Sequence, residues 1–494
     1  MAENKELIKS GVPNLDYVLG GGFPLYSVNI VAGPSGSGKT ILTLQIIFTN
    51  CGDSAKGLVF TTLSEPAFKM IRYQQDFDYF DADKLNESVY LIDIGQVIRQ
   101  KGLQEALEVI TEQVELHSPQ LIAIDSFKAI HDLAASRTEV RRFAYDLAVR
   151  LSTWMCTSFL VGEYTREEIL NEPAFAVADG ILYMENAKQG MQNVRVLNIA
   201  KMRGRGHFTG DHPFSISEQG ITVYPRIRTP EVPEMYEVAE EKLSTGVAGL
   251  DQMLQGGFPQ GSMTLIAGSA GTGKTLVSLH FAISGMERGE PCVLVTFQET
   301  PSHLQGLAKG FGWDLGKWEE EGLLKILYTS PVELIVDQHT AHTKETILDL
   351  GARRVVIDGL KDIEIAIPDK VRFKDYTYSL AAFFRAQGVT ALLTNEIPEL
   401  FGTMTLSEHG VSFISDNVIM LRYVELGSAI TRAISVLKMR GSDHDKSLRE
   451  YRITSAGVEV LEPFAGVEGV LSGTPTARRP AEADFEALLK KMSK

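Results

Sequence analysis

Two glycine-rich stretches of this chain carry the residue types that bind phosphate. The first, from Gly33 to Thr40, reads Gly-Pro-Ser-Gly-Ser-Gly-Lys-Thr, and the second, from Gly268 to Thr275, reads Gly-Ser-Ala-Gly-Thr-Gly-Lys-Thr. Glycines let backbone N–H groups turn toward phosphate oxygens, the Lys reaches the β- and γ-phosphates, and the Thr hydroxyl holds Mg²⁺. Each stretch therefore predicts a nucleotide site. The residues predicted to contact the nucleotide are Ser35, Gly36, Ser37, Gly38, Lys39, Thr40 and Ile41 in the first site and Ala270, Gly271, Thr272, Gly273, Lys274, Thr275 and Leu276 in the second.

Four carboxylates stand where apolar runs end. Asp125 and Asp358 each close such a run, where a carboxylate can hold a Mg²⁺-bound water beside the loop threonine. The alternative for this pair is a helix N-cap. Glu65 and Glu299 end the strand expected after each loop helix, where a carboxylate could polarise the water that attacks the γ-phosphate. The alternative for this second pair is an exposed glutamate beside a proline turn.

A Lys-Met-Arg-Gly sequence also occurs twice. It places Lys201 beside Arg203 in the first half and Lys438 beside Arg440 in the second. Residues two apart on a strand point the same way, so each pair of cations faces one target. A γ-phosphate across a subunit interface fits that target, as an arginine-finger-like device. The alternative is an edge-strand charge pair that opposes aggregation.

Three further positions remain open on sequence alone. Glu163 and Asn395 close the next strands and could sense the γ-phosphate, although ordinary loop polarity explains them equally well. Phe311 could stack on adenine or could be a core aromatic.

The elements around these residues repeat as well. An apolar, β-branched run precedes each loop (28–32 and 263–267), and a helical pattern follows it. Further apolar runs at 58–63, 121–125, 158–161, 292–297, 355–358 and 391–394 alternate with helical stretches such as 101–116 and 137–151. Asp179 recurs as Asp416. The sequence therefore predicts two tandem α/β domains, each a mainly parallel sheet flanked by helices. We place the first domain at 1–228, a linker rich in proline and glutamate at 229–242, the second domain at 243–470 and a tail at 471–494.

Composition narrows the class of protein. The hydrophobic fraction is 44%, and no apolar run approaches the roughly 18 residues that span a bilayer. The N-terminus lacks an apolar signal region, so we expect a cytoplasmic protein with no membrane role. The formal net charge of −15 makes nucleic acid an improbable partner. The three cysteines lack metal-ligand spacing and are expected to be reduced thiols.

The chain resembles the KaiC family, the double-lobed RecA-like ATPases of the bacterial circadian clock, over about residues 7–475. The most specific stretches are Gly246–Thr275, Tyr423–Glu425, Arg432–Asp445 and Leu471–Thr476. The resemblance implies two RecA-like P-loop domains in a homohexameric double ring, with ATP and Mg²⁺ at the subunit interfaces. It implies that the Lys-Met-Arg-Gly cations reach a neighbour's nucleotide, and it adds His207, Arg432 and Met439 to the nucleotide contacts. It also implies a steady ATPase in the first ring, autophosphorylation of adjacent Ser and Thr in the second, and a KaiB-like partner. A KaiA-like partner would bind the tail, and the short tail here argues against it.

Two departures from the family pattern bear on phosphorylation. The family carries two adjacent glutamates where this chain has Ser64-Glu65 and Gln298-Glu299, and Gln accepts no proton at neutral pH. The acceptor pair maps onto Ser412-Phe413, which leaves Ser412 as the one candidate acceptor.

The leading hypothesis is thus an ATPase for timing, stress or signalling control, with weak autokinase activity at most. The alternatives are a full Ser/Thr autokinase and autophosphatase, a DNA recombinase or helicase on the same core, and an assembly scaffold with negligible turnover.

Overall fold

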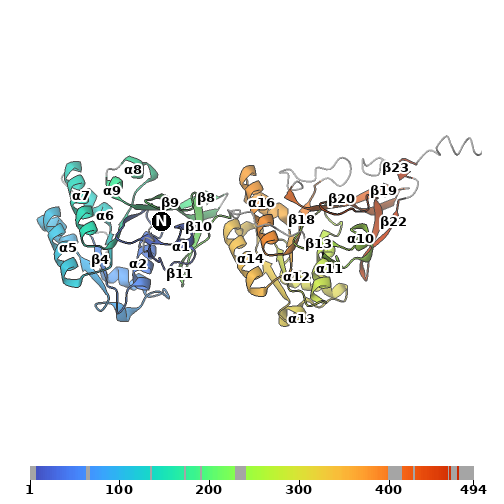
Figure 1. Cartoon of the computed structure of the whole chain (residues 1–494), viewed down its shortest axis with the longest axis horizontal. Helices are drawn as coiled ribbons and strands as arrows, with labels where there is room; N and C mark the ends of the chain where they lie inside the picture. Colours follow the sequence, from blue (N-terminus) through green and yellow to red (C-terminus); the bar gives the residue numbers. More distant parts are fainter. Residues whose placement is uncertain are drawn as a thin grey trace, which may run out of the picture. The chain divides into compact units, whose positions relative to one another are not determined.

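The computed structural model divides into two compact units, Met1–Arg226 and Ile227–Lys494 (Figure 1). The predicted residues Glu65 and Ser412, together with Ser64 and Phe413, lie outside the described residues. The structure describes residues 7–62, 67–133, 136–171, 174–189, 192–227, 241–398, 414–426, 429–464, 467–468 and 476–477.

The described part of the first unit contains a nine-stranded sheet with the order β11-β10-β9-β8-β3-β7-β6-β4-β5. The six strands from β8 to β5 in that order run parallel, while β9, β10 and β11 are antiparallel to their neighbours. The strands are β3 (Val28–Ala32), β4 (Gly57–Thr61), β5 (Val89–Asp93), β6 (Leu121–Asp125), β7 (Thr157–Gly162), β8 (Gly180–Gln189), β9 (Gln192–Met202), β10 (Asp211–Ser217) and β11 (Gly220–Val223). A separate ladder pairs β1 (Leu7–Ile8) with β2 (Phe23–Pro24).

Helices precede and connect the parallel strands of this sheet. They are α1 (Leu15–Val18), α2 (Lys39–Asn50), α3 (Ala67–Gln74), α4 (Gly95–Lys101), α5 (Leu103–His117), α6 (Phe127–Leu133), α7 (Arg137–Thr153), α8 (Arg166–Asn171) and α9 (Ala174–Val177), with a 3₁₀ turn η1 (Ala82–Lys84). The stretch 101–116, expected as one helix, is divided because α4 ends at Lys101 and Gly102 has a φ of 89° before α5 begins.

The second unit repeats this architecture, again with nine strands in its described sheet, in the order β16-β15-β17-β18-β14-β19-β20-β21-β22. The strands are β14 (Met263–Gly268), β15 (Cys292–Thr296), β16 (Leu324–Tyr328), β17 (Arg354–Asp358), β18 (Thr390–Glu396), β19 (Asn417–Leu426), β20 (Ala429–Met439), β21 (Arg449–Thr454) and β22 (Gly457–Pro463). Small ladders pair β12 (Lys242–Leu243) with β13 (Phe258–Pro259) and β23 (Val467–Glu468) with β24 (Thr476–Ala477). The helices are α10 (Ala248–Met253), α11 (Lys274–Met286), α12 (Pro301–Gly310), α13 (Leu315–Glu320), α14 (Val336–Leu350), α15 (Leu360–Ala366) and α16 (Lys370–Ala386), with η2 (Pro331–Glu333).

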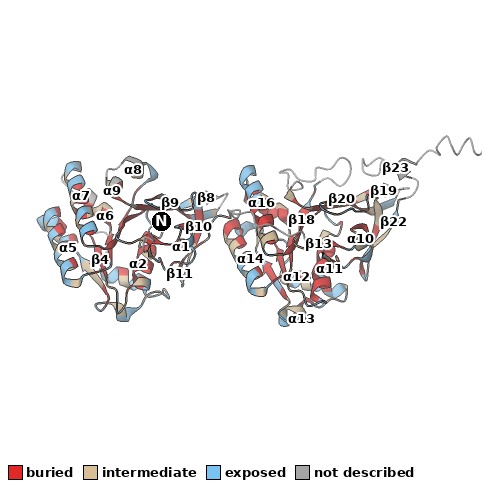
Figure 2. Cartoon of the chain, viewed as in Figure 1, coloured by how far each residue is buried: buried red, intermediate tan, exposed pale blue. Residues whose placement is uncertain are grey.

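Each sheet is covered on both faces, which is why its central strands are buried along their whole length (Figure 2). In the second unit, Val356 packs in the cluster that includes α11, whereas its neighbour Val355 packs in the cluster that includes α14 and α16. Alternate side chains of a strand point to opposite faces, so a run with two buried faces must be continuously apolar. The first unit has the same two-cluster arrangement.

The predicted class, two α/β domains with mainly parallel sheets, is confirmed. The three antiparallel strands that extend each sheet, β9 to β11 and β20 to β22, go beyond what the sequence indicated. Among the described residues, no helix combines the length and the apolar composition that crossing a bilayer requires.

Candidate nucleotide sites

Each phosphate loop connects the central strand of its sheet to a helix that begins at the loop lysine. Gly38 and Gly273 precede α2 and α11 with φ values of 95° and 94°. Gly33 opens the first loop against β8, where an added Cβ would lie 1.9 Å from the backbone oxygen of Met184. Only glycine fits there, because the neighbouring strand approaches the loop so closely. The backbone N–H groups at the start of each helix are thereby directed at the space above the loop.

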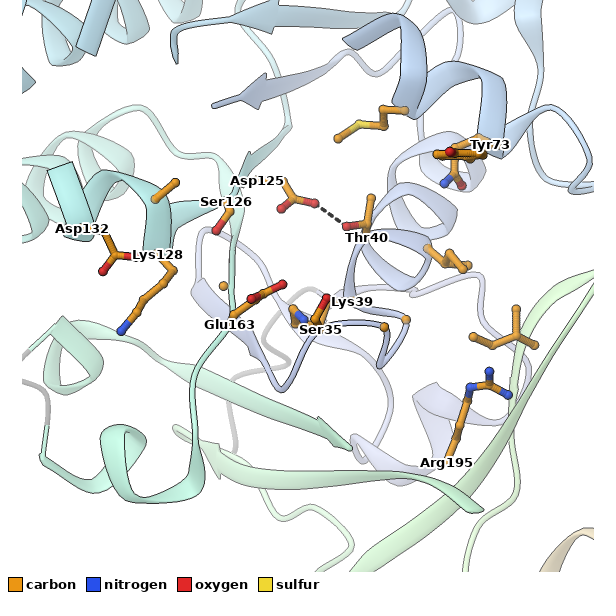
Figure 3. Close-up of a pocket in the computed structure, with 18 residues that line it drawn as sticks. Ser35, Lys39, Thr40, Tyr73, Asp125, Ser126, Lys128, Asp132, Glu163 and Arg195 are labelled. Carbon is orange, nitrogen blue, oxygen red and sulfur yellow. Dashed lines mark hydrogen bonds between the residues drawn. The ribbon is translucent and has the colours of Figure 1, made fainter. Parts of the chain in front are cut away.

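A cavity of about 740 Å³ lies above the first loop (Figure 3). Ser35, Gly36, Gly38, Lys39, Thr40 and Ile41 line it from the loop and α2. The Lys39 ammonium donates to the backbone oxygen of Pro34 at 2.7 Å. Burial lowers the pKa of Lys39, and the carboxylates of Glu163 and Asp125 oppose that effect. A buried cation with nearby acidic groups is suited to exchange its loop contact for a phosphate oxygen.

The second cavity, of about 430 Å³, lies above the second loop. Ala270, Gly271, Gly273, Lys274, Thr275 and Leu276 line it. The Lys274 ammonium donates to the backbone oxygens of Gly268 at 2.9 Å and Ser269 at 3.0 Å. Burial lowers the pKa of Lys274 as well. The remaining predicted loop residues, Ser37 and Thr272, are fully buried, and the Thr272 hydroxyl donates to Ser269.

The threonine at each helix start meets the aspartate that ends the strand two places from the loop strand in the sheet. The Thr40 hydroxyl donates to Asp125 Oδ2 at 2.6 Å, a contact that Figure 3 shows as a dashed line. The Thr275 hydroxyl donates to Asp358 Oδ2 at 2.8 Å, and Thr394 donates to Asp358 Oδ1 at 2.5 Å. Burial raises the pKa of Asp358, while these two hydroxyl donors lower it.

In each lobe, the threonine hydroxyl and the aspartate carboxylate together suit Mg²⁺. Hydroxyl and carboxylate oxygens suit a hard cation that keeps most of its waters and takes further ligands from substrate phosphates. Within the described residues there is no group of three or more His, Cys, Asp or Glu side chains that could hold a metal ion without such help. Thr40 with Asp125, and Thr275 with Asp358, would therefore hold Mg²⁺ only together with a nucleotide, and the ion would neutralise phosphate charge there.

In both lobes an acidic residue stands at the carboxyl end of the strand that pairs in parallel with the loop strand. Glu163 follows β7 and lines the first cavity, and Glu396 ends β18 and lines the second. The strand registers pair Ala32 with Gly162 and Gly268 with Glu396, so Glu396 is the structural counterpart of Glu163. Matching Glu163 with Asn395 from the sequence is wrong by one residue, because the counterpart is the following residue, Glu396. Asn395 itself is buried, at 7% exposure.

Glu299 and Gln298 lie in the turn that follows β15, and both line the second cavity. The Glu299 carboxylate pairs with the imidazole of His303 on α12. The Gln298 side-chain amide donates to both oxygens of Asp362, at 3.3 Å and 3.1 Å. Asp362 lies in the first turn of α15, four residues after Asp358.

The Lys-Met-Arg-Gly cations lie away from the described cavity of their own lobe. The Lys201 ammonium donates to the Phe175 backbone oxygen at 3.4 Å, and the Lys438 ammonium donates to that of Ser415 at 2.7 Å. Each lysine lies near the end of its strand, and the arginine follows one residue beyond it. The Arg203 guanidinium lies 3.4 Å from the Asp179 carboxylate, and the Arg440 guanidinium lies 3.8 Å from the Asp416 carboxylate.

Two aspartates fix the position of these turns. The Asp179 carboxylate accepts from the Val28 amide at 3.0 Å, and its backbone oxygen accepts from the Arg203 amide at 2.8 Å. Asp416 makes the same two contacts, with the amides of Met263 at 3.0 Å and Arg440 at 3.1 Å. Each aspartate therefore joins the first residue of the strand that enters the phosphate loop to the turn that carries the cations.

The other predicted contacts fall into two groups. Phe311 lines the second cavity and packs against the core, where it stacks on Trp313 with ring centroids 5.3 Å apart; its stacking on adenine stays a prediction. His207 and Arg432 do not line the described cavities, and the Arg432 guanidinium lies over the Tyr423 ring. The Met439 side chain is 8% exposed and packs in the core, so a nucleotide contact there would fall to its backbone.

Several cavity residues escaped the sequence analysis. Lys128 and Lys361 each stand three residues after a strand-ending aspartate, a recurrence that could have been found. Arg195 from β9 and Tyr73 from α3 line the first cavity, as Figure 3 shows. Neither belongs to a repeated pattern, and only the folded chain brings them to the loop.

Two such loops, each on a mainly parallel sheet flanked by helices, define a tandem RecA-like P-loop ATPase. The family model for the KaiC ATPase matches residues 8–228 and again residues 243–464. The chain belongs to the KaiC family.

Curated relatives cover nearly the whole chain. The circadian clock oscillator protein KaiC of Acaryochloris marina is 31% identical over 483 residues, which is 95% of this chain and 91% of the relative. The circadian clock protein KaiC3 of Synechocystis sp. is 30% identical over 492 residues, which is 97% of this chain and 96% of the relative. The circadian clock oscillator protein KaiC of Nostoc sp. is 30% identical, with 95% and 92% coverage. Membership favours the ATPase hypothesis over a DNA recombinase or helicase.

Proposed function

We propose that this chain is a KaiC-like ATPase that binds Mg·ATP in both lobes and hydrolyses it at the interfaces of a homohexameric double ring. The observation that carries the proposal is the repeated set of loop lysine, loop threonine and strand-ending aspartate. Lys39, Thr40 and Asp125 recur as Lys274, Thr275 and Asp358, with hydroxyl-to-carboxylate distances of 2.6 Å and 2.8 Å. Two independent copies of the same geometry argue against a chance arrangement.

The chain's own residues supply most of the machinery for phosphoryl transfer. The loop amides and the N-termini of α2 and α11 bind the phosphates, and Lys39 and Lys274 neutralise their charge. Thr40 and Asp125, with their counterparts, orient the Mg²⁺ that offsets charge on the leaving phosphate. Glu65 is the proposed group that polarises the attacking water in the first lobe, and Glu299 and Gln298 are the two candidates beside the second cavity.

A second copy of the chain completes each site in this proposal. Lys201 and Arg203, and likewise Lys438 and Arg440, approach a nucleotide held by the neighbouring subunit and stabilise charge in the transition state. His207 and Arg432 contact that nucleotide from the same side. Their location away from the cavity of their own lobe supports this arrangement.

Phosphorylation of the chain itself is limited in the proposal to a single site. Ser412 keeps a hydroxyl, whereas Phe413 at the adjacent position has none. Gln298 stands where the family carries a glutamate base, so transfer to Ser412 would be weak.

The biological role we propose is circadian-type timing, or stress and signalling control, in the cytoplasm. The KaiC relatives carry clock names, and a KaiB-like protein would be the partner. The deciding experiment measures phosphate release and phosphate incorporation side by side on the purified chain with Mg·ATP. Phosphate release that exceeds phosphate incorporation many-fold supports an ATPase. Equal amounts of the two would favour an autokinase, and neither release nor incorporation would favour a scaffold.

A further inference from the structure

The second lobe contains a carboxylate–amide pair that the first lobe cannot form at the same place. Gln298 and Asp362 both line the second cavity, and the Gln298 amide nitrogen lies 3.1 Å and 3.3 Å from the two oxygens of Asp362. Four residues after Asp125, at the position that matches Asp362, the first lobe has Ala129. The pair is therefore a feature of one site only.

The contact fixes the orientation of the Gln298 amide. A carboxylate accepts hydrogen bonds but donates none, so it selects the NH₂ end of the glutamine. The amide oxygen is then the end left to accept from another donor. Asp362 is only 8% exposed, and the turn from Gly359 holds its backbone. Such a buried anchor holds the glutamine side chain in one orientation at the cavity.

The surroundings place the pair at the phosphate end of the cavity. Burial raises the pKa of the Asp362 carboxyl, the hydrogen bond from Gln298 opposes that effect, and the charges of Asp358 and Glu396 add to it. Both of these carboxylates line the same cavity, next to Lys274 and Thr275. Lys274 and Thr275 are the residues assigned above to the γ-phosphate and Mg²⁺.

We propose that Gln298 positions the attacking water in the second lobe, with Asp362 as the positioning residue that holds its amide, so that the phosphoryl acceptor of this lobe is water and not a protein hydroxyl. This inference rests on the proposed ATPase function and specifies the acceptor of one site. A glutamine can orient water for attack on a γ-phosphate without accepting a proton, because its carbonyl oxygen needs only to accept a hydrogen bond.

The step balances without a protein base. The water oxygen forms a bond to the γ-phosphorus, and the bond from that phosphorus to the β–γ bridging oxygen breaks with its electron pair leaving on ADP. One proton of the water stays on the inorganic phosphate and the other passes to solvent. A serine hydroxyl, by contrast, must lose its proton as it attacks, and Gln298 cannot accept that proton.

Glu299 is the competing candidate within the same turn. Its carboxylate is engaged by His303, with side chains that are 37% and 71% exposed, respectively. Gln298 is itself exposed, but its partner Asp362 is buried, whereas Glu299 pairs with the exposed His303. The pre-organised group is therefore Gln298, and the two assignments predict different mutational effects.

The test measures phosphate release by the full-length chain, its apparent KM for ATP, binding of a fluorescent ATP analogue, and particle size. Phosphate release is measured per assembled particle, and the difference between wild type and Lys274→Ala at equal particle mass defines the share of the second lobe. We expect Asp362→Asn and Gln298→Ala each to lower that share about tenfold or more, with KM changed by less than about twofold. Asp349→Asn, the same change at an exposed position on α14, is the control and should leave all four measurements as in wild type.

The exchange variant Gln298→Glu/Asp362→Asn again pairs one amide with one carboxylate. It should regain a large part of the share lost by Asp362→Asn, as expected for coupled neighbours. Three results would each overturn the inference. The first is that Asp362→Asn behaves like Asp349→Asn, and the second is that Glu299→Gln removes second-lobe hydrolysis that Gln298→Ala leaves intact. The third is that Lys274→Ala removes no hydrolysis. If the wild-type chain releases no phosphate at all, the proposed ATPase function itself fails.

Discussion

The Thr275 hydroxyl lies 2.8 Å from Asp358 Oδ2, across the start of α11 and the end of β17. The Thr40–Asp125 contact reproduces it at 2.6 Å in the first lobe. These contacts join elements far apart in the sequence, and each holds a hydroxyl and a carboxylate where one hydrated cation can meet both. The first prediction follows from this geometry.

Asp358→Asn should reduce the hydrolysis contributed by the second lobe at least about tenfold, because the amide removes the charge that orients the Mg²⁺-bound water. The Mg²⁺ concentration for half-maximal activity should rise. Phosphate release across a Mg²⁺ titration measures both effects, with Asp349→Asn as the matched control. An unchanged titration would exclude Asp358 from the metal site.

Lys39→Ala and Lys274→Ala should each impair assembly as well as turnover. The lysine neutralises phosphate charge, and a nucleotide placed between subunits is part of the interface. Light scattering with Mg·ATP present measures the particle mass, and an exposed substitution, Lys325→Ala on β16, serves as control. A Lys39→Ala protein that is fully hexameric and fully active would contradict the first-lobe assignment.

Arg203→Ala should lower the turnover number of the first-lobe site at least about tenfold, while binding of ATP changes little, because the arginine acts on transition-state charge. A mixing experiment tests its action between subunits. Arg203→Ala chains co-assembled with Lys39→Ala chains should regain activity, since some interfaces then combine an intact loop with an intact cation.

Arg99→Ala, an exposed change on α4, is the control for that mixture. Activity that equals the weighted mean of the two parent variants would show that Arg203 serves only its own chain.

Incubation with Mg·ATP should modify at most one position near residue 412. Phe413 offers no hydroxyl, and Gln298 cannot activate one by taking its proton. Intact-mass and peptide mass spectrometry measure the outcome, with Ser412→Ala as the reference. Stoichiometric phosphorylation at two positions there would contradict both arguments.

His339 should make the second lobe sensitive to acid. Burial, with a smaller effect from His342, lowers the pKa of His339 to about 4, from an ordinary value of 6.5. The unfolded chain therefore binds the proton first, so the stability present above pH 6.5 is lost as the pH falls toward 4. Between pH 7 and pH 5 this loss is about 2 kcal/mol.

Urea unfolding at pH 7 and pH 5, followed by circular dichroism and tryptophan fluorescence, measures that difference. His339→Asn should flatten the pH dependence, whereas His342→Asn, an exposed change on the same helix, should keep most of it. Equal pH dependence in both variants would assign the proton to another group.

The sequence located the phosphate loops, the strand-ending aspartates and the repeated cations because each depends on local order along the chain. The apolar run, the glycine-rich loop and the following helix are adjacent in sequence, so Gly38, Lys39 and Thr40 can be recognised without a structure. The parallel sheets followed from the same runs.

The missed residues depend on register and on contacts between distant segments. Glu396 was passed over for Asn395 because the end of β18 cannot be fixed to one residue from its apolar pattern. Arg195 reaches the first cavity from β9, one of the antiparallel strands. The contact of Gln298 with Asp362 joins two turns that follow different strands, and neither turn alone indicates the other.

Asp179 and Asp416 each connect the strand that enters a phosphate loop to the Lys-Met-Arg-Gly turn of the same lobe. One carboxylate secures the strand entering the phosphate loop, and the same residue's carbonyl secures the turn with the outward cations. A single residue therefore contacts both segments in each lobe. In the ring that we propose, such a link would connect the occupancy of one active site with that of the next, so we expect turnover around it to be cooperative.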